Sequence, residues 1–221
     1  MIQENLQSIR QRLPQGVALV AVSKFHPVER LLEAYQAGQR IFGENRPQEL
    51  AAKVPQMPAD VQWHFIGHLQ TNKIKLVLPY VSLVQSVDSL HLLQAIAAWA
   101  QANDRTVDVL LELHLGAEET KHGFTEEEIL SIVEGVGTPT PSKLSHVRIR
   151  GLMGMATNTE DMAVVEREFE RMEGLFRRIQ EMGLPDFTEL SIGMSGDWPV
   201  AVRHGATMVR IGTDIFGPRE Y

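Results

Sequence analysis

One lysine near the N-terminus and two hydroxyl-glycine pairs near the C-terminus are the residues best suited to chemistry. Lys24 follows the apolar run 17–22, and the pairs Ser195-Gly196 and Gly212-Thr213 lie in the run 191–217. Glycine permits close backbone approach to an anion, which the hydroxyls and nearby N–H groups can bind. A lysine beside such loops suits a Schiff base with a phosphorylated aldehyde, because partial desolvation lowers the pKa of the ammonium and frees the amine.

The elements that carry these residues alternate between short apolar runs and longer segments of helical period. The predicted strands are residues 17–24, 40–44, 62–67, 82–88, 107–116, 147–156, 187–195 and 208–214. Helical patterns cover, among others, 27–37, 90–103, 125–136 and 161–182, with Gly38 and Gly183 as C-terminal stops. Eight such units predict an α/β fold, a single (β/α)8 TIM barrel, with residues 3–13 as an extra N-terminal helix.

Barrel geometry brings the chemical residues together. Active sites in this fold lie at the C-terminal ends of the strands, and phosphate sites often use the loops after strands seven and eight. Those loops carry Ser195-Gly196 and Gly212-Thr213. Closure of the barrel sets strand eight beside strand one, so we expect Lys24 to point into the same mouth.

Length and charge narrow the functional classes. The chain has 221 residues, a net charge of −7 and no cysteine. We expect one domain, 1–221, because the Gly/Pro/Ser/Thr-rich stretch 135–145 is too short to separate two. The acidic balance argues against nucleic-acid binding, and the short apolar runs argue against a membrane span. The absence of cysteine fits a reducing compartment, so a cytoplasmic location is expected.

Several ordered sequence blocks resemble the pyridoxal phosphate homeostasis proteins, the YggS or PROSC family, whose fold is related to the barrel of alanine racemase. The blocks are AVSKFHP around Lys24, FGENRPQE at 42–49, WHFIGHLQTNK at 63–73, KHGF at 121–124, GLMGMAT at 151–157, LSIGMSGD at 190–197 and VRIGTDIFGPR at 209–219. The likeness covers nearly the whole chain. It implies pyridoxal 5′-phosphate (PLP) held as a Schiff base on Lys24.

The resemblance also implies roles for the other site residues. The cofactor phosphate is expected against Ser195 and Thr213 and the backbone around Gly196 and Gly212. Arg210 is expected to face the pyridine nitrogen. An arginine cannot accept a proton, so it leaves that nitrogen unprotonated and weakens the ring as an electron sink.

For Asn45 and Met155, the resemblance implies a contact with the cofactor, but a purely structural role is also possible. Asn45 is expected near the ring hydroxyl, although it could instead cap the following helix. Met155 is expected under the ring, although it could instead be inward-facing core shared with Met153.

The resemblance implies a noncatalytic PLP-binding protein acting in vitamin B6 and amino-acid balance. Its candidate partners are PLP-dependent apoenzymes or a regulatory protein. The alternative is a PLP-dependent amino-acid racemase, which needs a second acid/base such as a tyrosine. Besides Tyr221, at the end of the chain, only Tyr35 and Tyr80 are present, and neither has an evident position for this role. Without the second domain of alanine racemase, a monomer is expected.

A metal site is not expected from the sequence. His64 and His68 are four residues apart, but they span a strand end and its loop. No third ligand has matching spacing, so these histidines are interpreted as lining or supporting the barrel mouth.

Overall fold

The computed structural model describes residues 1–116, 122–136 and 144–218. Eight parallel strands form a closed barrel in chain order, with the eighth strand paired to the first. They are β1 (Ala18–Val22), β2 (Ile41–Glu44), β3 (Gln62–Phe65), β4 (Val81–Val87), β5 (Val107–Glu112), β6 (Val147–Met153), β7 (Glu189–Ser191) and β8 (Met208–Ile211). The predicted (β/α)8 barrel is confirmed.

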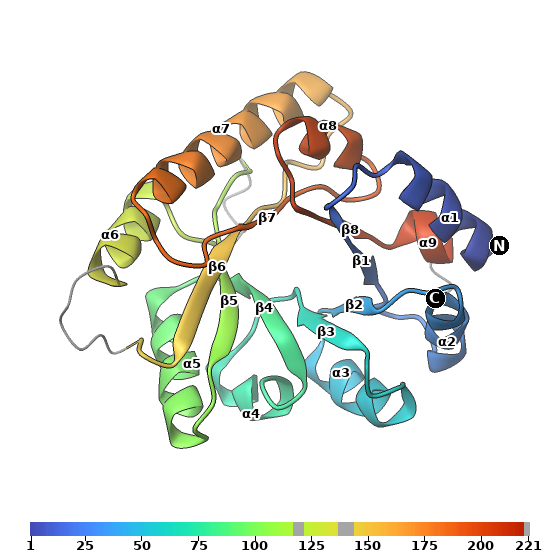
Figure 1. Cartoon of the computed structure of the whole chain (residues 1–221), viewed down its shortest axis with the longest axis horizontal. Coiled ribbons are helices and arrows are strands. Elements are labelled where there is room, and N and C mark those ends of the chain that lie inside the picture. Colours follow the sequence, from blue (N-terminus) through green and yellow to red (C-terminus); the bar gives the residue numbers. More distant parts are fainter. Residues whose placement is uncertain (117–121, 137–143, 219–221) are drawn as a thin grey trace.

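Helices surround the ring of strands (Figure 1). The α-helices are α1 (Ile2–Arg12), α2 (Val28–Gln36), α3 (Pro47–Lys53), α4 (Ile74–Val77), α5 (Leu90–Ala102), α6 (Glu126–Val136), α7 (Met162–Glu181), α8 (Trp198–Arg203) and α9 (Thr213–Phe216). Two short 3-10 helices are η1 (Val54–Gln56) and η2 (Thr71–Lys73). The predicted extra helix is α1, which packs beside α9: the Asn5 side chain donates to the Ile215 carbonyl at 3.0 Å.

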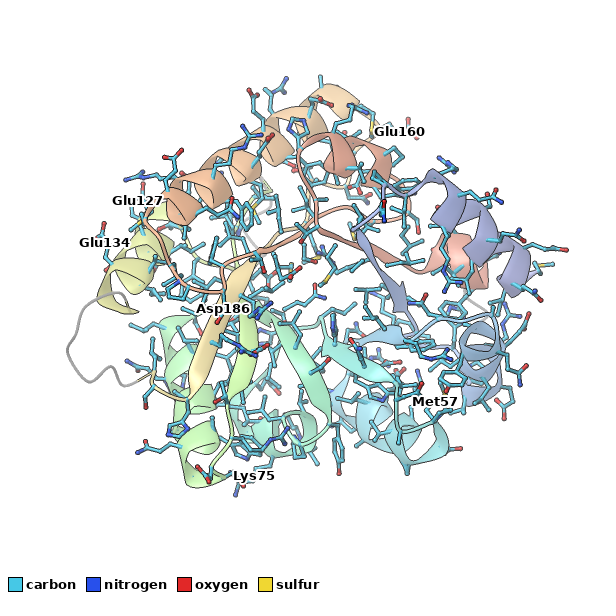
Figure 2. The ribbon with its side chains drawn as sticks, in the orientation of Figure 1. Met57, Lys75, Glu127, Glu134, Glu160 and Asp186 are labelled. Atoms are coloured by element: carbon cyan, nitrogen blue, oxygen red, sulfur yellow. The ribbon has the colours of Figure 1, made fainter. Side chains whose placement is uncertain are left out.

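The apolar core has two parts because the strands are covered on both faces. Inside the barrel, one cluster contains Val20, Leu83, Leu110, Met153 and Met208. A larger cluster fills the space between the strands and the helices. Side chains fill the centre of the ring, whereas the labelled Lys75 extends outward from α4 (Figure 2). Among the described residues the barrel interior is therefore a packed core and not a pore.

The strand ends differ from the sequence prediction. The predicted strand 187–195 ends at Ser191 because Gly193 turns the chain with a φ of +96°. The predicted strands 17–24, 107–116 and 147–156 likewise end early, at residues 22, 112 and 153. Lys24 and Met155 therefore lie in loops just after their strands, which gives both side chains access to the barrel mouth.

The predicted helix stops are confirmed. Gly38 and Gly183 follow α2 and α7 with φ values of +87° and +73°, a left-handed conformation that favours glycine. Of the Gly/Pro/Ser/Thr-rich stretch 135–145, residues 137–143 lie outside the described part of the chain. Within the described ranges, none of the helices is long and apolar enough to cross a bilayer.

Candidate functional site

Two adjoining pockets open at the C-terminal ends of the strands and share Val22, Lys24, Met194 and Arg210. The first, of about 200 Å³, is also lined by His26, Ser195, Gly196, Gly212, Thr213 and Gly217. The second, of about 330 Å³, is also lined by Asn45, Ile66, Gly67, His68, Glu112, His122 and Met155. All eight residues singled out from the sequence line one pocket or both, so the fold brings them together.

Pairing of the first and last strands sets Lys24 beside the two glycine loops. Val20 and Ala21 of β1 lie opposite Arg210 and Ile211 of β8. One residue further, a Cβ on Gly212 would lie 3.2 Å from the Val22 carbonyl oxygen. Glycine at this position allows the loop after β8 to lie against the end of β1, and Lys24 follows two residues later.

A network beneath the loop holds the backbone of Lys24. The Phe25 N–H donates to Glu49 Oε2 at 2.9 Å, and Phe25 has a φ of +67°, which is uncommon outside glycine. The Ser23 hydroxyl donates to Glu44 Oε1 at 2.7 Å, and the Lys53 ammonium contacts the same oxygen at 2.7 Å. Burial raises the pKa of Glu44, while Lys53 and Ser23 oppose that rise. These contacts stabilise the turn that presents Lys24.

The loop after β7 is held by Asp197. Its Oδ1 accepts a hydrogen bond from the Met194 N–H at 2.5 Å, closing the turn that contains Ser195 and Gly196. Burial raises the pKa of Asp197, and the Met194 N–H opposes that rise. A Cβ placed on Gly196 would meet no described protein atom within 4 Å, so this side of the loop is open. The Asp214 N–H approaches Ser195 Oγ at 3.5 Å and links the loops after β7 and β8.

Arg210 is 4 % exposed and is held inside the barrel mouth by fixed acceptors. Its Nη1 donates to the Ser191 carbonyl at 2.8 Å and to the Ser191 hydroxyl at 2.6 Å, and its Nη2 donates to the Gly154 carbonyl at 2.8 Å. Burial lowers the pKa of Arg210 to about 10, while Glu112 and Asp197 oppose that fall. Arg210 therefore stays protonated at neutral pH and can only donate.

Asn45 and Met155 lie on the second pocket. The N-cap of α3 is Arg46, with no side-chain cap bond, so Asn45 is not the helix cap that the sequence left open. Its buried Oδ1 has no hydrogen-bond partner among the described residues. Met155 packs against the inner cluster that contains Met153 and also faces the pocket, so its core role and its pocket position coexist.

His68 lines the second pocket, in agreement with its predicted place at the barrel mouth, whereas sequence reasoning missed Glu112 and His122 as pocket residues. Glu112 is 6 % exposed at the end of β5, and burial, followed by the nearby Asp88 charge, raises its pKa to about 7 although Arg210 opposes the rise. The sequence did hold a signal for Glu112, which lies within the apolar run 107–116. A charged residue in a strand that is covered on both faces is costly to bury, so it indicates a functional site. His122 carried no comparable signal.

His64 and His68, considered together in the sequence as possible metal ligands, lie in different environments in the structure. His64 is buried inside the barrel, where burial lowers its pKa to about 4, and its Nδ1 lies 2.8 Å from Gln85 Nε2. Gln85 Oε1 in turn accepts from the Ser191 hydroxyl at 2.7 Å. A chain of polar contacts thus runs from His64 through Gln85 and Ser191 to Arg210 and helps to hold the guanidinium in place. His68 lies at the mouth and contacts Asp88 instead.

The fold and the site define a class: a closed (β/α)8 barrel with a lysine after the first strand beside two anion-suited loops. The family model for the alanine racemase N-terminal domain matches residues 1–220. The alanine racemase of Bartonella henselae is similar in fold, with a TM-score of 0.75 and 15% identity over 100% of this chain and 60% of that chain.

Two closer comparisons specify the family. The pyridoxal phosphate homeostasis protein of Vibrio alginolyticus is 37% identical over 235 residues, which cover 100% of this chain and 98% of that protein. PipY of Synechococcus elongatus, solved with PLP bound, is 37% identical with a TM-score of 0.88, covering 98% of this chain and 100% of that chain. This chain belongs to the pyridoxal phosphate homeostasis protein family.

Proposed function

We propose that this protein binds PLP through Lys24 and acts in intracellular PLP homeostasis without catalytic turnover. The observation that carries the proposal is the meeting of Lys24 with Ser195 and Thr213 around one pocket. An amine and a phosphate site in one pocket match a phosphorylated aldehyde. The names of the relatives and the PLP held by PipY support the same ligand.

The residues present fit this ligand at both of its ends. At the phosphate end, Gly196 offers open space beside two hydroxyls, and Gly212 allows the backbone to approach. At the ring end, the unpartnered buried Asn45 Oδ1 would accept a hydrogen bond from a ring substituent. Met155 offers a polarisable apolar surface on the same pocket.

Two properties of the pocket support binding without turnover. PLP, when bound, supplies an electron sink whose strength depends on protonation of its pyridine nitrogen. Arg210 would donate a hydrogen bond to that nitrogen and leave it unprotonated, which weakens the electron sink. The racemase alternative also needs a second acid/base, but of the described tyrosines neither Tyr35 nor Tyr80 lines either pocket. The hydroxyl of Tyr35 instead donates to Asp60 at 2.6 Å.

The domain organisation, oligomeric state, location and partners of the protein are also part of the proposal. The chain as a single domain, 1–221, acting as a monomer, remains a prediction. So does a cytoplasmic location, which the absence of cysteine supports. PLP-dependent apoenzymes or a regulatory protein remain candidate partners. Analytical ultracentrifugation with and without PLP tests the monomer.

The experiment that tests the ligand is borohydride reduction of the protein mixed with PLP, followed by peptide mass mapping. We expect a new visible absorption band and one adduct at Lys24. Lys24→Ala should lose both, whereas Lys75→Ala, an exposed lysine on α4, should keep both (Figure 2). An adduct elsewhere, or none, would contradict the binding proposal. Amino-acid racemization at rates above those of free PLP would contradict the noncatalytic part.

A further inference from the structure

We propose that His68, Asp88 and His122 bind a divalent transition metal, Zn²⁺, at the rim of the second pocket. Nδ1 of His68 lies 2.6 Å from Asp88 Oδ2, and Nδ1 of His122 lies 3.8 Å from the same oxygen. One potential ligand atom from each of the three residues lies within 4.8 Å of the other two. The grouping thus places two imidazoles around one carboxylate.

This donor set matches the chemistry of zinc. Zn²⁺ binds imidazole nitrogen and carboxylate oxygen at about 2.0–2.2 Å, so the ligand atoms of a tetrahedral site lie about 3.3 Å apart. Asp88 is fixed, with a side chain only 5 % exposed, whereas the side chains of His68 and His122 are 44 % and 58 % exposed. The two histidines can rotate by the small amount that brings the three ligand atoms to this spacing.

The backbones that carry the three ligands are held in place. The residues follow three successive strands, β3, β4 and β5, whose C-terminal ends meet at one edge of the barrel. The Ser86 hydroxyl donates to the Gly67 carbonyl at 2.5 Å, which ties the end of β4 to the residue before His68. Such preorganisation reduces the cost of assembling a site.

His122 is held in a different way. The Phe124 N–H donates to the Glu112 carbonyl at 2.8 Å, so the chain after His122 is bonded to the end of β5. Gly123 has a φ of +131°, and a Cβ placed on it would lie 2.7 Å from the backbone nitrogen of His114. Only glycine fits this approach, which holds His122 opposite His68. The two rings stack with centroids 4.0 Å apart.

The position of the three ligands gives the metal access to the pocket. His68 and His122 line the same pocket as Lys24 and Glu112. Three protein ligands leave a fourth zinc position for water or for an anionic ligand group. We expect that position to face the pocket, where a carboxylate or a similar oxygen donor could occupy it. The site does not depend on PLP, because none of its ligands is among the proposed PLP contacts.

The test is calorimetric titration of Zn²⁺ alone into the full chain freed of PLP. We expect one ion bound with micromolar or tighter affinity, and a Co²⁺-substituted protein with visible bands typical of a tetrahedral site. Changes to groups that merely orient a metal ligand cost about 10- to 100-fold in affinity. Asp88→Asn, His68→Ala and His122→Ala should each weaken binding by at least that much.

Two controls make the result specific. His146→Ala changes a histidine that precedes β6, at the opposite end of the strands, and should bind Zn²⁺ as the unaltered protein does. Lys24→Ala should also keep Zn²⁺, which separates this proposal from PLP binding. A millimolar affinity of the unaltered protein, or equal affinities of Asp88→Asn and His146→Ala, would overturn the site. In either case the His68–Asp88 contact would be a hydrogen bond only.

Discussion

The Arg210 guanidinium donates through one nitrogen to both the carbonyl and the hydroxyl of Ser191, at 2.8 and 2.6 Å. The two residues lie on adjacent strands, β7 and β8. The Ser191 hydroxyl donates onward to Gln85 of β4, whose amide lies beside His64 of β3. A polar chain thus crosses the barrel interior and fixes a cation at its mouth, which an apolar core could not do.

Ser191→Ala should destabilise the protein by about 1–3 kcal/mol, because it leaves Gln85 Oε1 without its donor and removes one Arg210 contact inside the barrel. Urea unfolding followed by circular dichroism measures the change. Ser131→Ala, on an exposed position of α6, is the control and should stay within about 0.5 kcal/mol. Equal effects of the two substitutions would show that the polar chain contributes nothing to stability.

Glu112 should make the protein less stable as the pH rises. Its folded pKa of about 7 lies above its ordinary value of 4.5, so the folded state holds a proton that the unfolded state has lost. The stabilisation is complete below about pH 4.5 and is lost as the pH rises through 7, amounting to about 3 kcal/mol. Glu112→Gln should remove this part of the pH dependence.

The measurement is urea unfolding at pH 5 and pH 8 in a chelating buffer, for the unaltered protein and for Glu112→Gln. His64 acts in the opposite sense, because its folded pKa of about 4 lies below its ordinary 6.5. Its stabilisation is present above pH 6.5 and is lost toward 4. The comparison with the variant cancels that contribution. Glu181→Gln, exposed at the end of α7, serves as control, and identical pH profiles for all three proteins would refute the role of Glu112.

Gly196→Ala and Gly212→Ala should separate ligand affinity from stability. A methyl on Gly196 meets no described protein atom within 4 Å, so stability should stay the same or rise by up to about 1 kcal/mol. The same methyl occupies open space in the pocket, so PLP affinity should fall. A methyl on Gly212 lies 3.2 Å from the Val22 carbonyl and should cost about 1–2 kcal/mol. Thermal melts and PLP titration give both quantities, and undiminished PLP affinity in Gly196→Ala would exclude this loop as the phosphate site.

Asn45→Ala should weaken PLP binding without destabilising the unliganded protein. Its Oδ1 has no partner among the described residues, so the fold loses no hydrogen bond there, whereas bound PLP would lose about 0.5–1.5 kcal/mol, or roughly two- to tenfold in affinity. Asn5→Ala is the matched control: it breaks the bond to the Ile215 carbonyl and should lower stability but not affinity. If Asn45→Ala melts at a lower temperature and binds PLP normally, Asn45 is structural only.

The barrel could be predicted from the sequence because its signals are local. Apolar runs alternate with helical periods, and glycines such as Gly38 and Gly183 mark the helix ends. Chain order in a closed barrel then fixes which loops are neighbours. This is why the sequence is enough to assign Lys24 and the pairs Ser195-Gly196 and Gly212-Thr213 to one mouth of the barrel.

The side-chain environments could not be predicted, because they depend on contacts between strands distant in the sequence. Asp88 and His122 are 34 positions apart, yet they meet because β4 and β5 are neighbours and Gly123 turns the chain inward. The pKa of Glu112 depends on its burial and on Asp88 and Arg210. Sequence alone determined the fold, the family resemblance and the lysine beside its glycine loops. Tertiary structure decided which polar groups are buried, which are paired and which remain open to a ligand, since burial and distance arise only when the barrel closes.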